Sequence, residues 1–155
     1  MCHVSHGTRT RPGRRAPDAW FENFSRVVPN PMPDQRPLTI LVAEDDSLIG
    51  ELLGEMLALM GHTVCAVTTC EIDTVAAAHR FQPDLMIVDM GLNPGSGIAA
   101  VDLIMRTNFI PYILVSGNVA RVRELRPAAM MLEKPYTQAS LAAAIARAAD
   151  MVIRL

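Results

Sequence analysis

Short apolar runs alternate with longer stretches of helical periodicity from Leu38 to the end of the chain. The apolar runs predict five strands, because each is short, rich in aliphatic residues and bounded by turn or charged residues. They cover residues 38–43, 63–67, 85–90, 111–115 and 128–132. The third run is apolar throughout except for Asp89, which is typical of a central parallel strand that is covered on both faces.

After each strand, apolar residues recur every three or four positions. This spacing predicts helices over 48–60, 71–81, 97–106 and 137–152, with a shorter helix over 118–125. Gly61 ends the first helix, and Thr68-Thr69-Cys70-Glu71 matches a capping box that opens the second. Strict alternation of strands and helices predicts an α/β fold, a doubly wound five-stranded parallel sheet with helices on both faces.

Polar residues stand at the carboxyl ends of the predicted strands, where parallel sheets place their chemistry. Glu44 and Asp45 follow the first strand, Asp89 ends the third, Ser116 follows the fourth and Lys134 follows the fifth. Three carboxylates at one edge would repel one another unless a divalent cation such as Mg²⁺ lay among them. An aspartate can accept a phosphoryl group as an acyl phosphate, and a lysine and a hydroxyl can bind its oxygens.

Taken singly, each of these residues has a simpler interpretation. The acids from Glu44 to Asp46 could start a helix favourably, Ser116 could serve a turn, and Lys134 could be a surface charge. Asp89 alone could do no more than cap the following turn. The phosphoryl-transfer hypothesis therefore depends on the predicted fold, which brings all these side chains to one edge of the sheet.

Over residues 38–155 the sequence resembles a receiver domain of the bacterial two-component response-regulator family. The resemblance implies the family's flavodoxin-like (βα)5 fold. Every position of the family's active-site pattern has a match: an acid pair, a phosphoacceptor, a hydroxyl and a Lys-Pro pair whose peptide bond is usually cis. These are Glu44 with Asp45, then Asp89, Ser116 and Lys134 with Pro135.

The resemblance also implies a role for each residue. Asp45 and Asp89 would ligate Mg²⁺ directly, the carbonyl of Gly91 would be a third protein ligand, and Glu44 would act mostly through water. The hydroxyl and the lysine of the pattern would hold the phosphoryl oxygens. The implied function is Mg²⁺-dependent phosphotransfer to Asp89 from a histidine kinase or a histidine phosphotransfer protein, in a two-component system or phosphorelay.

On this interpretation the chain is a signalling receiver rather than an enzyme, and its reactions are its own phosphorylation and autodephosphorylation. The Val115-Ser116-Gly117 turn resembles single-domain receivers of the FATGUY class, which implies that the chain has no output domain of its own. A degenerate receiver remains the alternative. Such a protein would keep the acids and act as an interaction module without being phosphorylated.

Two departures from the family pattern affect the expected switch. Met131 stands where the family often has an aromatic residue, and the segment from Ser116 to Lys134 is short. We therefore expect the signal to leave through the face formed by residues 117–126, the last strand and the last helix, with Arg121 and Arg123 at its rim.

Two other uses of a strand-end acid do not fit the sequence. Phosphohydrolases of the haloacid dehalogenase type need a second acid two residues after the nucleophile, and Gly91 stands there. A flavodoxin would need a phosphate loop rich in hydroxyls and glycine after the first strand. The acids at 44–46 would repel a phosphate at that position in the absence of a metal.

Composition limits the number of domains, the location and the oligomeric state that we expect. The chain has 155 residues, 50% of them hydrophobic and 19% charged, which predicts one globular domain. It has neither an apolar run long enough to span a membrane nor an apolar signal segment, so we expect a cytoplasmic protein with no membrane partner. The odd number of cysteines, Cys2, Cys65 and Cys70, supports neither a disulfide framework nor a zinc site. We expect a monomer or weak homodimer.

Residues 1–36 differ from the rest. They contain six arginines and three acids and are rich in proline, which predicts a disordered basic arm before a receiver domain over 37–155. Such an arm could bind nucleic acid, but it lacks hydrophobic periodicity, and no nucleic-acid partner is expected. Met32 leaves a second interpretation open, in which residues 1–31 lie upstream of the true start.

Overall fold

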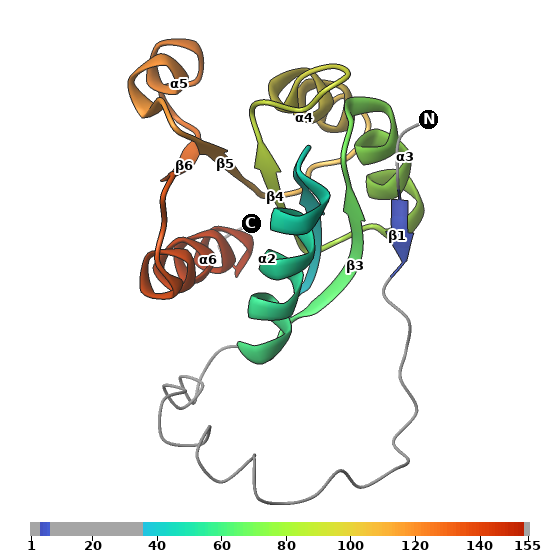
Figure 1. Cartoon of the computed structure of the whole chain (residues 1–155). Coiled ribbons are helices and arrows are strands. Elements are labelled where there is room, and N and C mark those ends of the chain that lie inside the picture. Colours follow the sequence, from blue (N-terminus) through green and yellow to red (C-terminus); the bar gives the residue numbers. More distant parts are fainter. Residues whose placement is uncertain (1–3, 7–35, 154–155) are drawn as a thin grey trace, which may run out of the picture.

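The computed structural model describes residues 4–6 and 36–153 of the chain. Strands and helices alternate along it, as Figure 1 shows. The strands are β1 (Val4–His6), β2 (Thr39–Ala43), β3 (Thr63–Thr68), β4 (Leu85–Asp89), β5 (Tyr112–Ser116) and β6 (Met130–Glu133). The helices are α2 (Ser47–Leu59), α3 (Glu71–Phe81), α4 (Gly97–Met105), α5 (Val119–Leu125) and α6 (Gln138–Ile153). No helix in the described ranges is long and apolar enough to cross a bilayer.

The strands form one sheet in the order β1-β3-β2-β4-β5-β6. Strands β2 to β6 pair in parallel, which confirms the predicted doubly wound α/β fold. The order of these five strands, β3-β2-β4-β5-β6, is that of a flavodoxin-like sheet. Strand β4 lies in the middle and is buried along its whole length, so its apolar side chains occupy both faces of the sheet.

Two apolar cores fill the space between the sheet and its two layers of helices. Helices α2 and α6 cover one face, where residues such as Leu57, Ile87 and Ile145 are fully or almost fully buried. Helices α3, α4 and α5 cover the other face, around Val88 and Ile104. Burial of a large aliphatic side chain stabilises a fold by about 1.5–3 kcal/mol, so these cores hold the strand ends in place.

Strand β1 is additional to the five predicted strands. Val4–His6 pairs antiparallel with β3, in a register that places Val4 opposite Thr68 and His6 opposite Ala66. For these three residues the structure differs from the expected disordered arm. Apart from Arg36, the remainder of the arm, including Trp20 and Met32, lies outside the described residues.

The start of α3 corrects a local prediction. Thr68 does not cap this helix, because its buried hydroxyl instead meets Thr74 Oγ1 at 2.8 Å and donates to the Val42 carbonyl at 3.4 Å. The N-cap is Cys70, whose side chain makes no capping hydrogen bond. Cys70 is disulfide-bonded, which the odd number of cysteines did not predict, whereas Cys65 is a free thiol.

Candidate phosphoacceptor site

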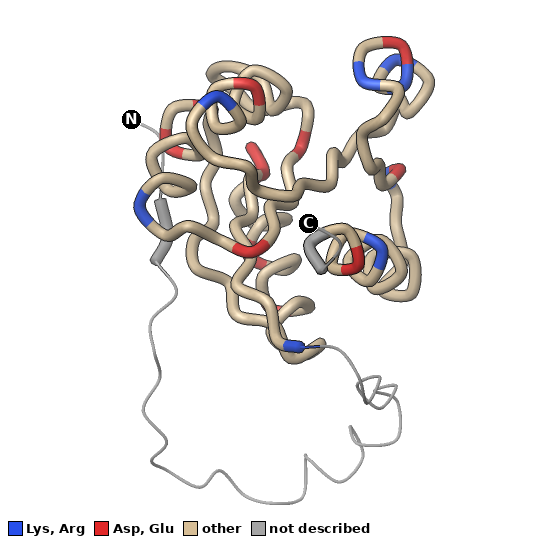
Figure 2. The backbone as a smooth tube through the Cα atoms, turned by 180° about the vertical axis from the view of Figure 1, so that it is seen from behind, with Lys and Arg blue, Asp and Glu red and all other residues tan. Residues whose placement is uncertain are grey.

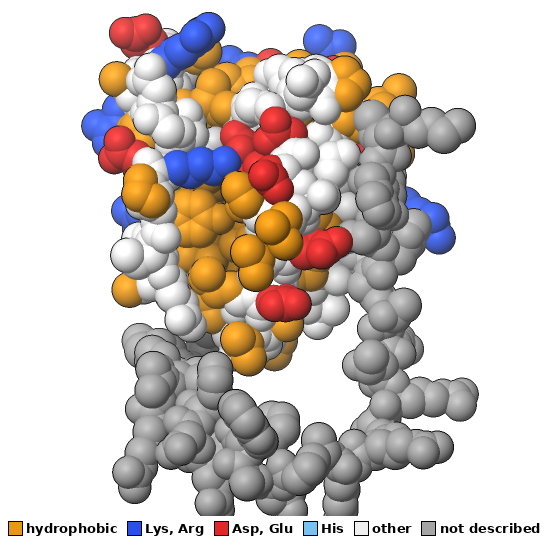
Figure 3. Space-filling model, viewed as in Figure 1, with side chains coloured by type: hydrophobic (Ala, Val, Ile, Leu, Met, Phe, Trp, Pro, Cys, Tyr) orange, Lys and Arg blue, Asp and Glu red, His pale blue; other side chains and the backbone are white. Residues whose placement is uncertain are grey.

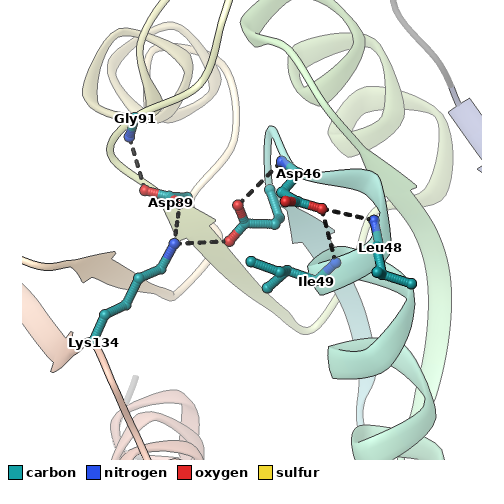
Figure 4. Close-up of polar contacts among 7 residues, drawn as sticks. Asp46, Leu48, Ile49, Asp89, Gly91 and Lys134 are labelled. Atoms are coloured by element: carbon teal, nitrogen blue, oxygen red, sulfur yellow. Dashed lines mark hydrogen bonds and ion pairs between the residues drawn. The ribbon is translucent and has the colours of Figure 1, made fainter.

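Asp89 closes β4 and is held by the sheet itself. It lies opposite Val115 of β5, and the next residue, Met90, donates its backbone N–H to the Val115 carbonyl at 3.0 Å. Asp89 is 7% exposed, so its carboxylate reaches the surface only at this edge. One carboxylate oxygen, Oδ1, accepts the backbone N–H of Gly91 at 2.8 Å (Figure 4). The chain thus fixes the position of the carboxylate before any ligand binds.

The acids after β2 approach Asp89 from the neighbouring strand. Glu44 is 4% exposed, and its Oε1 accepts the backbone N–H of Asp46 at 3.2 Å. Asp45 is exposed. One carboxylate oxygen each from Glu44, Asp45 and Asp89 lies within 4.8 Å of the others. The structure therefore brings together the three carboxylates that the sequence predicted at one edge.

Lys134 lies between two of these acids. Its Nζ donates to Glu44 Oε2 at 3.0 Å and forms a close ion pair with Asp89 Oδ2 (Figure 4). The peptide bond from Lys134 to Pro135 is cis, as the family resemblance implied. The lysine therefore contacts two of the three clustered carboxylates and offsets part of their charge.

Burial and charge shift two pKa values at this edge. Desolvation raises the pKa of Glu44 to about 7, against the lowering effect of the hydrogen bond from Lys134. Burial lowers the pKa of Lys134, but its hydrogen bonds to Asp89 and Glu44 outweigh this effect and raise the pKa above its usual value. The charged form of the lysine is therefore favoured by the carboxylates around it.

Ser116 ends β5, one residue beyond the partner of Asp89 in the ladder. Its hydroxyl accepts the backbone N–H of Asn118 at 3.0 Å, and its carbonyl accepts the N–H of Lys134 at 2.9 Å. Among the described residues, the hydroxyl makes no hydrogen bond to Asp89. The structure places Ser116 at the predicted edge, with its hydroxyl turned to the following loop.

Two acids outside the predicted site, Asp46 and Glu71, support it. The Asp46 carboxylate caps α2 by accepting the N–H groups of Leu48 at 3.0 Å and Ile49 at 3.2 Å. Glu71 accepts the N–H of Ser96 at 2.9 Å and so ties α3 to the loop after Asp89. Only the capping role had a signal in the sequence, because an acid directly before a helix often caps it.

The donor set fits a hard divalent cation. The three clustered side chains are all carboxylates, which Mg²⁺ prefers, and they lie at the ends of two adjacent strands. Lys134 contributes a single positive charge against them. Further positive charge at this edge would therefore lower the repulsion among the acids.

Comparisons with known proteins point to one family. The model of the response regulator receiver domain matches residues 40–146. Transcriptional regulatory protein PdtaR of Mycobacterium tuberculosis is 31% identical over 113 residues, which are 70% of this chain and 55% of PdtaR. Protein-glutamate methylesterase/protein-glutamine glutaminase 2 of Anaeromyxobacter dehalogenans is 29% identical over 111 residues, 68% of this chain and 33% of that protein. The chain thus spans between a third and about half of these relatives.

Solved structures extend the likeness to the fold. The response regulator PhyR from Brucella abortus superposes with a TM-score of 0.72 at 24% identity, over 77% of this chain and 51% of PhyR. The receiver domain of PhyR from Erythrobacter litoralis gives a TM-score of 0.67 at 25% identity, over 72% of this chain and 89% of that domain. Together with the family match over most of its length, these findings establish that the chain belongs to the response regulator receiver domain family.

Proposed function

We propose that this receiver is a phosphoacceptor, and that Asp89 takes a phosphoryl group from the phosphohistidine of a histidine kinase or histidine phosphotransfer protein. A carboxylate oxygen of Asp89 forms the new O–P bond as the N–P bond of the phosphohistidine breaks, and the donor's imidazole leaves. The observation that carries this proposal is the placement of Asp89, a nearly buried strand-end carboxylate with two further acids within 4.8 Å and a lysine on its Oδ2.

Mg²⁺ would be held by Asp45 and Asp89 directly, by the Gly91 carbonyl, and by Glu44 through water. When bound, such a cation supplies positive charge that offsets the incoming phosphoryl oxygens. Lys134 contributes from the protein side, because its Nζ already lies at Asp89 Oδ2 and can follow the charge onto the phosphoryl group. The hydroxyl of Ser116 becomes a further partner of the phosphoryl oxygens if it turns from Asn118 toward them.

The surface beside the site supports a protein as the phosphoryl donor. Helix α2 begins directly after the acids and carries large apolar side chains in water: Leu48 is 64% exposed and Leu52 54% exposed. Figure 3 shows orange hydrophobic side chains next to the red acidic cluster on this face of the molecule. Apolar groups grouped beside a reactive centre favour a partner that covers them while its own reactive group meets Asp89.

Phosphorylation by a small phosphodonor such as acetyl phosphate, followed by intact-protein mass spectrometry, tests the proposal. We expect one Mg²⁺-dependent phosphate on the wild-type chain, labile in acid and base, none on Asp89→Asn, and none after chelation of the metal. Asp150→Asn is the matched control, because Asp150 is an exposed aspartate on α6, and it should be phosphorylated normally. Ser116→Ala should slow the reaction without abolishing it.

Retention of the phosphate by Asp89→Asn would contradict the assignment. A wild-type chain that takes no phosphate from the small donor or from a phosphohistidine donor would instead be a degenerate receiver that acts through binding alone.

A further inference from the structure

The loop between Asp89 and α4 carries Gly91, whose carbonyl is the proposed third protein ligand of Mg²⁺. The start of this loop is anchored on the sheet. Met90 donates its backbone N–H to the Val115 carbonyl at 3.0 Å, and Gly91 donates to Asp89 Oδ1 at 2.8 Å. No backbone N–H of the described residues donates to the carbonyl of Gly91. The anchored start of the loop therefore leaves this carbonyl available to a ligand.

The end of the loop is anchored on Glu71, the first residue of α3. The Glu71 Oε2 atom accepts the backbone N–H of Ser96 at 2.9 Å, and the Glu71 backbone N–H donates to the Pro94 carbonyl at 3.2 Å. Gly95 packs closely against the same residue, since a Cβ atom added at Gly95 would lie 2.4 Å from the Cβ atom of Glu71. A single residue of α3 thus holds three consecutive residues of the loop.

The contact at Glu71 is linked to the site through backbone. Ser96 is the N-cap of α4, and the next residue, Gly97, donates its N–H to the Met90 carbonyl at 3.2 Å and packs on the Asp89 carbonyl. Helices α3 and α4 lie side by side, and Figure 2 shows them from behind with their acidic positions in red. A displacement of Ser96 would therefore reach the backbone at Asp89.

A simpler interpretation is that the Glu71 carboxylate only stabilises α3, because a negative charge is favourable in the first turn of a helix. Asp73 allows this interpretation to be tested. It is the other acid in that turn, and its buried Oδ2 atom has no hydrogen-bond partner among the described residues. Asp73 therefore has the same charge at the helix start, whereas the carboxylate of Glu71 also holds the loop.

We propose that Glu71 is a positioning residue of the metal site, which holds the loop so that the Gly91 carbonyl and the Asp89 carboxylate can bind one cation together. This inference rests on the proposed function, because it requires Mg²⁺ at the acids of that site. A loop that is ordered before the metal binds loses less conformational freedom on binding. Residues that orient metal ligands typically contribute 10–100-fold to metal affinity, so the affinity of this site should depend on Glu71.

The test is a titration of the full-length chain with Mn²⁺, which accepts the same oxygen ligands as Mg²⁺ and is followed by electron paramagnetic resonance. We expect Glu71→Ala to bind Mn²⁺ about tenfold more weakly than the wild type. Glu71→Gln should restore most of the affinity, because its amide oxygen can still accept the N–H of Ser96. Gly95→Ala should weaken binding as Glu71→Ala does, because the added methyl group would push the loop away from Glu71.

Phosphorylation by acetyl phosphate, measured over a range of Mg²⁺ concentrations, gives a second readout. Glu71→Ala should need about tenfold more Mg²⁺ than the wild type but reach the wild-type rate at saturation, because Asp89 itself is unchanged. Asp73→Asn is the matched control. It removes a charge from the same helical turn without touching the loop, and it should bind Mn²⁺ as the wild type does.

Equal Mn²⁺ affinity of Glu71→Ala and the wild type would overturn the proposal. An equally large loss in Glu71→Gln or in Asp73→Asn would do the same, since the charge at the start of α3 would then be responsible. A wild-type chain that binds Mn²⁺ but takes no phosphate would contradict the proposed phosphotransfer alone, because the affinities still decide the role of Glu71. A wild-type chain that binds no Mn²⁺ would overturn both.

Discussion

Helices α4 and α5 each follow a strand that carries a residue of the site, and they are anchored very differently. In α4, which follows Asp89, four residues are buried: Gly97, Ala100, Val101 and Ile104. In α5, which follows Ser116, only Val122 is buried. Since burial of apolar surface is the main stabilising contribution, α4 is fixed to the sheet far more firmly than α5.

The loops before the two helices show the same difference, because the loop before α4 is tightly packed and the loop before α5 is not. A Cβ atom added at Gly97 would lie 2.1 Å from the Asp89 carbonyl oxygen, so backbone packs directly on backbone there. A Cβ atom added at Gly117 would meet nothing within 4 Å. The comparison shows that the site has one rigid side, which carries Asp89, and one adjustable side, which carries Ser116. An element with few buried contacts is the kind that a ligand can bias between two arrangements.

The largest predicted effect comes from exchanging the two glycines for alanine, one at a time. Gly97→Ala should cost at least about 3 kcal/mol of unfolding free energy, because the methyl group would force the loop away from Asp89. Gly117→Ala should change it by less than about 0.5 kcal/mol, because the added methyl group has open space. Urea unfolding of both variants measures the difference. Equal losses would mean that the two loops are equally constrained.

A second pair of variants compares the helices themselves with the same chemical change. Val101→Ala and Val122→Ala each remove buried methyl groups, for a cost of about 1–2 kcal/mol. We expect the change at Val101 to lower global stability, whereas the change at Val122 should mainly speed hydrogen exchange of the α5 amides, since that helix can open alone. Amide hydrogen exchange followed by mass spectrometry distinguishes the two. Uniform loss of protection in Val122→Ala would show that α5 unfolds only with the whole domain.

The smallest predicted effect concerns the ion pair that joins the two helices. Arg126 lies at the end of α5 and pairs with Asp102 of α4, but their side chains are 35% and 48% exposed. Solvent screening therefore limits the coupling energy to about 0.5 kcal/mol. A double-mutant cycle with Arg126→Gln and Asp102→Asn, in low and high salt, measures it. A coupling above about 1.5 kcal/mol that persisted in high salt would make this pair a strong anchor of α5 and weaken the contrast with α4.

Periodicity was enough to predict the five parallel strands and their order of appearance, because a strand buried on both faces, such as β4, leaves a short apolar run in the sequence. The same reasoning predicted one shared edge of the sheet for Glu44, Asp45, Asp89 and Lys134, since the carboxyl ends of parallel strands lie together. These predictions needed only local patterns and one rule of topology.

Features that depend on contacts between residues far apart in the sequence were not predicted. Strand β1 forms through pairing of Val4 with Thr68, far along the chain, and its own sequence carries no strand signal. The apparent capping box failed because Thr68 is buried at the end of β3 and because Glu71 binds Ser96 instead. The direction of the Ser116 hydroxyl likewise depends on the loop that follows it. In each case a tertiary contact decided between options that the local sequence allowed equally.

Strand β1 also limits how copies of this protein can aggregate. Its three residues pair along positions 66–68 of β3 and form the outermost strand on that side of the sheet. A very short edge strand is a poor template for pairing with a strand of another molecule. Strand β1 therefore makes this side of the sheet less prone to extend into a second copy than an uncovered β3 of six residues would be.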